Sequence, residues 1–270
     1  MRRAMLYGLV LGALATASAS AADVPYWVEP MKKVHDRFKG TPGTFAQFTM
    51  AYWAPLAGSP KNMSPEMAKA HELVKTTMKP ECWSKWKGAD YGNNGGMTIR
   101  WAHDNVDKWL QKHNPETVLI MFGTNDLGTL QVKEYEEKTR AVVERCLKNG
   151  TVVILSTLPP RSGLQEKAKT FAEAARRIAK EQKVPFVDYF EEVLQPRPDD
   201  WDGTLPKFKE FAKDVYQAPT LIAADGVHPS NPKQFQDYSE ESLKSNGYAL
   251  RSYLTLLAYA DVIRHVLQPG

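Results

Sequence analysis

Four short apolar runs stand out along the chain. They cover residues 43–48, 117–122, 151–156 and 185–188, and three of them are closely followed by turn-forming residues or prolines. Continuous apolar runs of this length are typical of strands that are buried on both faces. The pattern therefore predicts four strands of a sheet with both faces covered.

Segments with the periodicity of a helix lie between these runs. One helix is predicted from about residue 132 to 148, where Gly150 follows as a stop signal. Another is predicted after a capping box formed by Ser162 and Gln165. A last helix is predicted over about residues 248–267.

The alternation of strands and helices indicates the fold class. Strands joined by helical crossovers form parallel sheets that carry helices on their faces. We therefore expect an α/β protein, a three-layer α/β/α sandwich with a central, mostly parallel sheet. Residues 22–270 show no internal repeat or linker and are expected to form a single domain.

Residues 195–224 interrupt this alternation. They are rich in Pro, Asp and Gly, with a possible short helix near residues 206–215. Connections of this length are usually either functional or mobile. Trp201 lies within the segment, where it would either fill the core or stack on a sugar.

The amino terminus has the pattern of a secretory signal. Arg2 and Arg3 precede a short apolar stretch, and the small residues Ala19, Ser20 and Ala21 suit a signal peptidase. We place the cleavage after Ala21 and expect a secreted or periplasmic protein. A short membrane anchor is the alternative interpretation.

Composition and charge limit the partners. The chain is 43% hydrophobic, enough for a sizeable core, and no apolar stretch approaches the ~20 residues of a membrane span. Without Arg2 and Arg3 the net charge falls from +4 to +2, too small to indicate nucleic acid or an anionic membrane as partner. We expect a monomer that binds a small or neutral molecule.

Neither a metal nor a cofactor is indicated. The histidines show no H-E-x-x-H spacing, and two cysteines cannot complete a zinc site. Export would permit a disulfide between Cys82 and Cys146, but a buried free thiol is an equal alternative.

The first motif with chemical potential lies near the carboxyl end. Asp225 and His228 stand three residues apart, in a turn restricted by Gly226 and Pro229. A carboxylate bonded to one imidazole nitrogen fixes the tautomer and supports proton uptake at the other. The motif predicts a general base with its orienting acid; an Asx turn with a surface histidine is the alternative.

A second motif, Gly123-Thr124-Asn125-Asp126, directly follows the run over residues 117–122. Asn125 would then lie at the carboxyl edge of the sheet, where open α/β folds bind ligands. Its amide could donate to an oxyanion, an interaction worth about 3 kcal/mol in a transition state. Ordinary turn capping is the alternative.

The third motif is a glycine-rich loop over residues 90–98, followed by a helical pattern. Its backbone N–H groups, including those of Gly95 and Gly96, could bind an oxyanion or a phosphate. The spacing is not G-x-G-x-x-G and no Walker lysine follows, which argues against a nucleotide site.

Together the three motifs resemble those of the SGNH (GDSL-type) hydrolases, over about residues 43–267. The resemblance implies a flavodoxin-like fold and hydrolysis of acyl or acetyl esters, and export and Trp201 point to an acetylated sugar or a similar small ester as substrate. It also implies roles: Gly96, or Gly95 one register away, as backbone oxyanion donor, and Asn125 as side-chain donor. His228 would be the base and Asp225 its partner.

The chain departs from the family where the nucleophile is expected. In such enzymes the first strand leads into Gly-Asp-Ser, but here Phe48 is followed by Thr49-Met50-Ala51 and helix-compatible sequence. A connection between strand and helix normally takes about 2 to 6 residues, so a lost segment best explains the join. Thr49 is the one hydroxyl at that place. Two functions follow: an ester hydrolase, or a binding protein of the same fold that has lost turnover.

Overall fold

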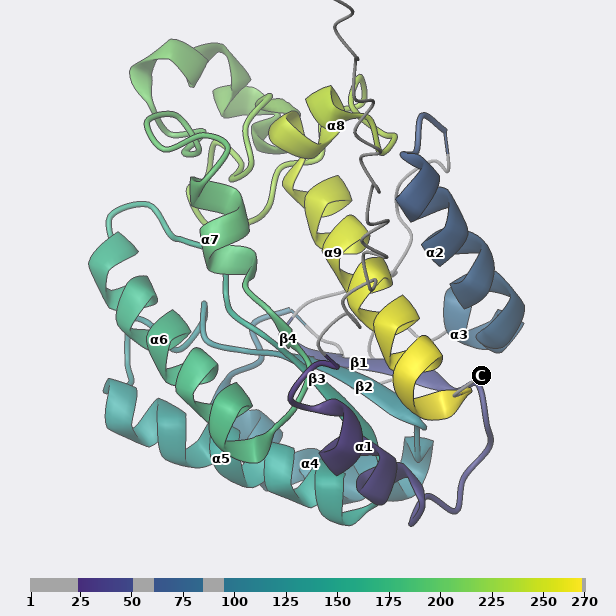
Figure 1. Cartoon of the computed structure of the whole chain (residues 1–270). Helices are drawn as coiled ribbons and strands as arrows, with labels where there is room; N and C mark the ends of the chain where they lie inside the picture. Colours follow the sequence, from purple (N-terminus) through teal and green to yellow (C-terminus); the bar gives the residue numbers. More distant parts are fainter. Residues whose placement is uncertain (1–23, 51–60, 85–94, 269–270) are drawn as a thin grey trace, which may run out of the picture.

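A parallel sheet lies at the centre of the computed structural model, which describes residues 24–50, 61–84 and 95–268 (Figure 1). In the described chain the sheet has four strands in the order β1-β2-β3-β4, each parallel to its neighbour. The strands are β1 Phe45–Thr49, β2 Thr117–Met121, β3 Val152–Ser156 and β4 Phe186–Val187. All four predicted strands are confirmed.

The strands form because their side chains are apolar on both faces. Every residue of β1, β2 and β3 is buried. Phe48 of β1 contacts Trp109, Trp101 and Phe122, with ring centroids 4.5, 5.6 and 5.3 Å away. Such aromatic clusters bury large areas and fix the packing between a sheet and its helices.

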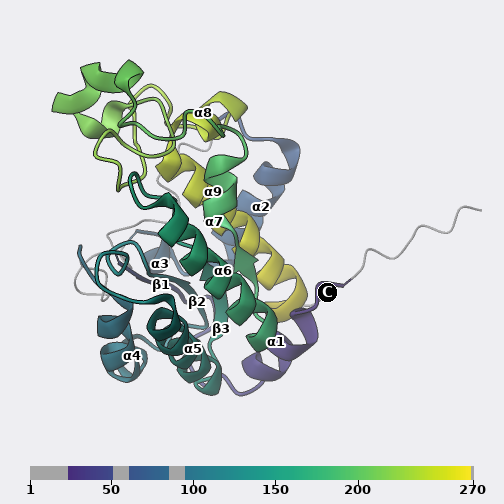
Figure 2. The ribbon, with the colours of Figure 1, turned by 90° about the vertical axis from the view of Figure 1, so that its left-hand side faces the viewer.

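Helices cover both faces of the sheet (Figures 1 and 2). One layer consists of α4 Ile99–His113, α5 Val132–Lys148 and α6 Gln165–Gln182. The other consists of α1 Val28–His35, α2 Pro65–Thr77 and α9 Gly247–Val262, which continues as a π-helical turn, Ile263–Leu267. The expected three-layer α/β/α sandwich is confirmed.

The ends of the helices test the predicted start and stop signals. Helix α5 has the predicted bounds, and Gly150 behind it has φ +87° in a place where a Cβ would lie 2.6 Å from the Phe38 nitrogen. The capping box predicted for α6 is wrong. Leu164 is the N-cap residue without a side-chain bond, and the Ser162 hydroxyl pairs with that of Thr204 at 3.0 Å.

The irregular segment over residues 195–224 contains two 3-10 helices, Pro206–Lys213 and Val215–Gln217. Trp201 within it is only 7% exposed and belongs to the hydrophobic core, which favours the core interpretation over a sugar platform. The short helices α3 Pro80–Ser84, α7 Tyr189–Leu194 and α8 Glu240–Ser245 complete the described elements.

Both cysteines are free thiols in the structure. The disulfide alternative is therefore wrong. Cys82 and Cys146 are both buried, and burial raises the pKa values of their thiols to about 11 and 12. The predicted signal peptide, residues 1–21, lies outside the described residues. Within the described part, no helix is long and apolar enough to cross a membrane.

Candidate active site

A small cavity lies at the carboxyl edge of the sheet. Its volume is about 60 Å³, and its lining includes Gly95, Gly96, Asn125 and His228. Parallel strands bring the loops after their carboxyl ends to one edge of the sheet, which explains how motifs from distant parts of the chain meet. The three motifs singled out in the sequence therefore face a single cavity.

The imidazole of His228 is held by Asp225. Nδ1 of His228 lies 2.7 Å from Oδ2 of Asp225, whose Oδ1 accepts hydrogen bonds from the amides of Val227 at 2.8 Å and His228 at 3.0 Å. Burial by itself raises the pKa of Asp225, but these amides and the imidazole outweigh it and hold the pKa below its ordinary value. Asp225 is therefore an ionised partner at neutral pH.

This contact leaves Nε2 of His228 as the nitrogen for proton exchange, because Nδ1 is engaged by Asp225. The imidazole is about half exposed, and the ring of Tyr216 lies 5.8 Å away. The turn is closely fitted at Gly226, which has φ +71° and where a Cβ would lie 2.5 Å from Cβ of Ser162.

The amide of Asn125 and the glycine-rich loop form another part of the cavity lining. Nδ2 of Asn125 donates to the carbonyl oxygen of Met97 at 2.9 Å, which engages one of its two N–H bonds. Gly96 has φ +82°, and a Cβ at Gly95 or Gly96 would meet no described atom within 4 Å. Both glycines therefore present open backbone to the cavity.

The end of β1 presents a methionine where a nucleophile is expected. Thr49 is the last residue of β1, fully buried and outside the cavity lining. Met50 lines the cavity instead, and its amide donates to the Met121 oxygen at 3.3 Å. The described lining contains no serine or cysteine; its side-chain hydroxyls are those of Thr124 and Tyr248.

Three polar residues of the lining were missed by sequence reasoning: Thr124, Tyr248 and Arg251. The Thr124 hydroxyl is buried and has no hydrogen-bond partner among the described residues. Burial lowers the pKa of Arg251 to about 10, which leaves it a cation at neutral pH. Thr124 stands within the second motif and could have been noticed, whereas Tyr248 and Arg251 lie on a helix whose pattern indicates only core packing.

A larger cavity, about 650 Å³, lies beside α8 and α9 and shares no described lining residue with the first. No histidine or cysteine is among its described lining residues, which include Tyr253 and Leu254. Among the described residues, no cluster of three or more His, Cys, Asp or Glu side chains could hold a metal ion. The small cavity is therefore the candidate active site.

A histidine-carboxylate pair and a side-chain amide line the same small cavity of a parallel α/β sandwich, and both kinds of group occur in hydrolases that use a general base and an oxyanion hole. The family model for the GDSL-like lipase/acylhydrolase family matches residues 80–232, more than half of the chain. The chain belongs to this family. The matched segment contains Gly96, Asn125, Asp225 and His228, and begins after β1.

Solved structures to which the chain is similar include a lipase/acylhydrolase from Enterococcus faecalis, 17% identical, with a TM-score of 0.46 over 78% of this chain and 92% of that one. A catalytic mutant of an acetylxylan esterase from Geobacillus stearothermophilus is 18% identical, with a TM-score of 0.47 over 81% and 96%. A hydrolase from the metagenome of Lake Arreo, Spain, is 15% identical, with a TM-score of 0.48 over 81% and 96%. No curated protein sequence matches the chain significantly.

Proposed function

We propose that the protein is an ester hydrolase whose cavity binds a small acyl ester, such as an acetyl ester of a carbohydrate. One observation supports this most: the His228 imidazole, oriented by Asp225, shares a cavity with Asn125 and Gly96. These are the parts that acyl transfer requires on the two sides of a carbonyl carbon.

In this proposal Nε2 of His228 takes the proton from the attacking hydroxyl or water, and Asp225 stabilises the imidazolium that forms. The carbonyl oxygen becomes an oxyanion, which accepts hydrogen bonds from the second N–H of Asn125 and from the backbone of Gly96. His228 then donates the proton to the leaving alcohol. Each well-placed oxyanion donor is worth about 3 kcal/mol in such a reaction.

The size of the cavity supports a small acyl group. A volume of about 60 Å³ corresponds to roughly two water molecules. That is the scale of an acetyl group, and a long acyl chain would have to extend outside.

A second candidate function is a binding protein that retains the pocket without turnover. Met50 at the end of β1 favours it, because the described lining contains no serine or cysteine to attack an ester. Loss of the serine from such a triad costs about six orders of magnitude in turnover and leaves about 10³ to 10⁴ over water.

Treatment of the purified protein with a fluorophosphonate probe and with p-nitrophenyl acetate distinguishes the two functions. Turnover that is lost in His228→Ala, with labelling at one residue, supports the hydrolase. The matched control is His265→Ala, a histidine packed against Trp27 outside the cavity. If the probe labels no residue, and if the protein and His228→Ala hydrolyse the ester at the same rate, the result supports the binding protein.

We further propose that the protein is exported, on the basis of Arg2, Arg3 and the small residues that end at Ala21. Export predicts a mature chain that begins at Ala22. Amino-terminal sequencing of the protein recovered from the periplasm or medium checks this, and a retained Met1 in a membrane fraction would support the anchor instead.

A further inference from the structure

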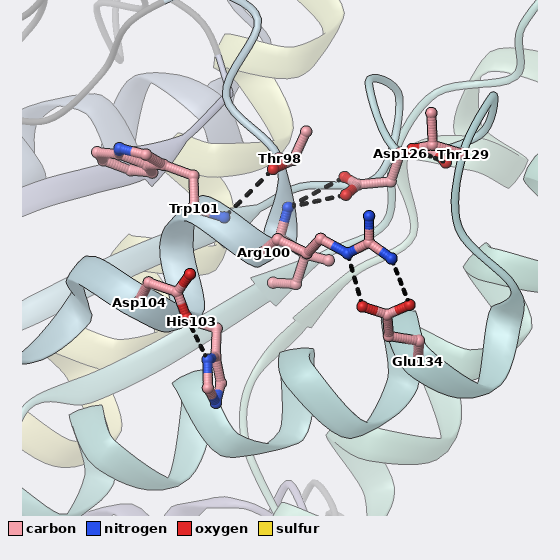
Figure 3. Close-up of polar contacts among 9 residues, drawn as sticks. Thr98, Arg100, Trp101, His103, Asp104, Asp126, Thr129 and Glu134 are labelled. Atoms are coloured by element: carbon pink, nitrogen blue, oxygen red, sulfur yellow. Dashed lines mark hydrogen bonds and ion pairs between the residues drawn. The ribbon is translucent and has the colours of Figure 1, made fainter.

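The carboxylate of Asp126 reaches from the second motif to the start of α4. Asp126 is fully buried, and both of its oxygens lie within hydrogen-bond distance of the Ile99 amide, at 3.0 and 3.1 Å (Figure 3). Helix α4 has a local cap as well, since the Thr98 hydroxyl accepts from the Trp101 amide at 3.2 Å. The first turn of α4 therefore has one cap from its own sequence and one from a loop 27 residues later.

A second bond connects the same two segments. Asn125, the neighbour of Asp126, donates to the oxygen of Met97 at 2.9 Å. Residues 125 and 126 thus hold residues 97 and 99 at two points, directly beside Gly96. A Cβ at Gly96 would meet no described atom within 4 Å, and these two hydrogen bonds hold the residues on either side of it.

The charge on Asp126 depends on its surroundings. Burial raises the pKa of its carboxyl group to about 6, while the amide of Ile99 and the guanidinium of Arg100 oppose the rise. Arg100 is itself engaged by Glu134, with N–O distances of 2.6 and 2.7 Å (Figure 3). Burial, helped by the charge of Asp126, raises the pKa of the Tyr135 phenol on α5, which donates to the carbonyl oxygen of Phe122.

Protonation would weaken the bond to Ile99, because a neutral carboxyl group has one acceptor oxygen fewer and no longer interacts with the helix N-terminus as an anion. The position of the segment before α4 would then depend on the hydrogen bond between Asn125 and Met97. The separation of the two oxyanion donors would therefore respond to a group that touches neither of them.

We propose that Asp126 is a positioning residue. Its ionised carboxylate accepts the hydrogen bond from the Ile99 amide, holds residues 95–99 against the turn at Asn125, and so sets the distance between the Gly96 and Asn125 donors. We call this contact between Asp126 and Ile99 the clasp. The importance of this distance for catalysis rests on the proposed function. The clasp itself is a structural property and can be measured without turnover.

Nuclear magnetic resonance of the unmodified full chain tests the clasp from pH 4 to pH 8. We expect the backbone amides of Ile99 and Gly96 and the side-chain amide of Asn125 to shift together, with one midpoint near pH 6, as follows from the pKa of Asp126. In Asp126→Asn, which retains an acceptor oxygen but cannot ionise, this titration should disappear while α4 remains folded.

Two control variants assign the titration. Glu134→Gln removes the carboxylate that engages Arg100 and leaves the Ile99 bond in place, so the three signals should still move together. His228→Ala removes the imidazole from the cavity and leaves the Ile99 bond in place, so the three signals should again move together. A midpoint that persists in Asp126→Asn, or an Ile99 signal that moves without those of Gly96 and Asn125, would overturn the proposal.

The two proposals fail in different ways. If the concerted titration is present but acetate binds nowhere near Asn125 and no ester is hydrolysed, the clasp stands and the proposed function fails. If the site hydrolyses esters with a pH profile that is the same in Asp126→Asn, the function stands and the positioning role fails.

Discussion

The carboxyl ends of β1 and β2 lie side by side, yet the residues that follow them differ in polarity. Thr49 of β1 is paired with Met121 of β2 in the sheet. Beyond Met121 the chain forms a polar turn, in which Asn125 and Asp126 are tied to the start of α4. Beyond Thr49 comes Met50, which presents an apolar side chain to the same cavity.

In the proposed function, stabilising an oxyanion and supplying a nucleophile would therefore be separable properties of this edge. The Asp126 carboxylate after β2 accepts a buried hydrogen bond from the first turn of a helix, so this turn contributes to the fold whether or not an ester is hydrolysed. A nucleophile after β1 has no such second role, and its loss would leave the sheet intact.

The largest effect should come from restoring the missing block. Insertion of Gly-Asp-Ser after Phe48 should raise hydrolysis of p-nitrophenyl acetate by about 10³-fold or more, because the serine of a triad is worth about 10⁶. Steady-state kinetics measure it. Insertion of Gly-Asp-Ala is the matched control, and equal rates for the two insertions would contradict the comparison.

The body of β1 should matter for stability far more than its end. Phe48→Ala should lower the free energy of unfolding by about 3–5 kcal/mol, because the side chain is fully buried among aromatic rings. Met50→Ala should cost about 2 kcal/mol, since Met50 already borders a cavity. Urea unfolding measures both, and equal losses would show that Met50, itself a buried core residue, contributes as much to stability as Phe48.

On the β2 side, Asn125→Ala should remove one oxyanion donor. In the protein with the restored serine we expect kcat to fall by about 10² to 10³ with little change in KM, since the donor acts on charge that develops in the transition state. A change confined to KM would show that Asn125 only binds the ester.

The pH dependence of stability should reveal the buried Asp126. Its pKa in the folded protein is raised to about 6, so the native state binds more protons than the unfolded chain between about pH 4 and pH 6. The contribution of this group is therefore fully present below about pH 4 and is lost as the pH rises through 6, by about 3 kcal/mol. Asp126→Asn should lack this decline; parallel curves from urea unfolding at each pH would contradict the assignment.

The smallest effect concerns the buried hydroxyl of Thr124. Thr124→Val should raise the free energy of unfolding by about 1 kcal/mol, because the hydroxyl has no partner, and should weaken acetate binding by about threefold to tenfold. Thr117→Val is the matched control. Its hydroxyl is equally buried and unpartnered at the other end of β2, so stability should rise without a change in acetate affinity measured by calorimetry.

Local pattern was sufficient for most of the elements. The bounds of α5 and the presence of the four strands followed from apolar runs and stop signals, because periodicity and turn chemistry act over a few residues. The capping box at Ser162 failed for the opposite reason: its hydroxyl found Thr204, 42 residues away, which no local rule could include.

The sequence by itself determined the class of fold, the Asp225-His228 pair, the glycines and amide of the candidate oxyanion site, and the absence of Gly-Asp-Ser after Phe48. Only the tertiary structure decided that Met50 rather than Thr49 borders the cavity and that both cysteines are free. It also decided that Asp126 caps a distant helix. These features depend on which segments meet when parallel strands bring their carboxyl ends to one edge, and such contacts between distant residues leave no periodic trace in the chain.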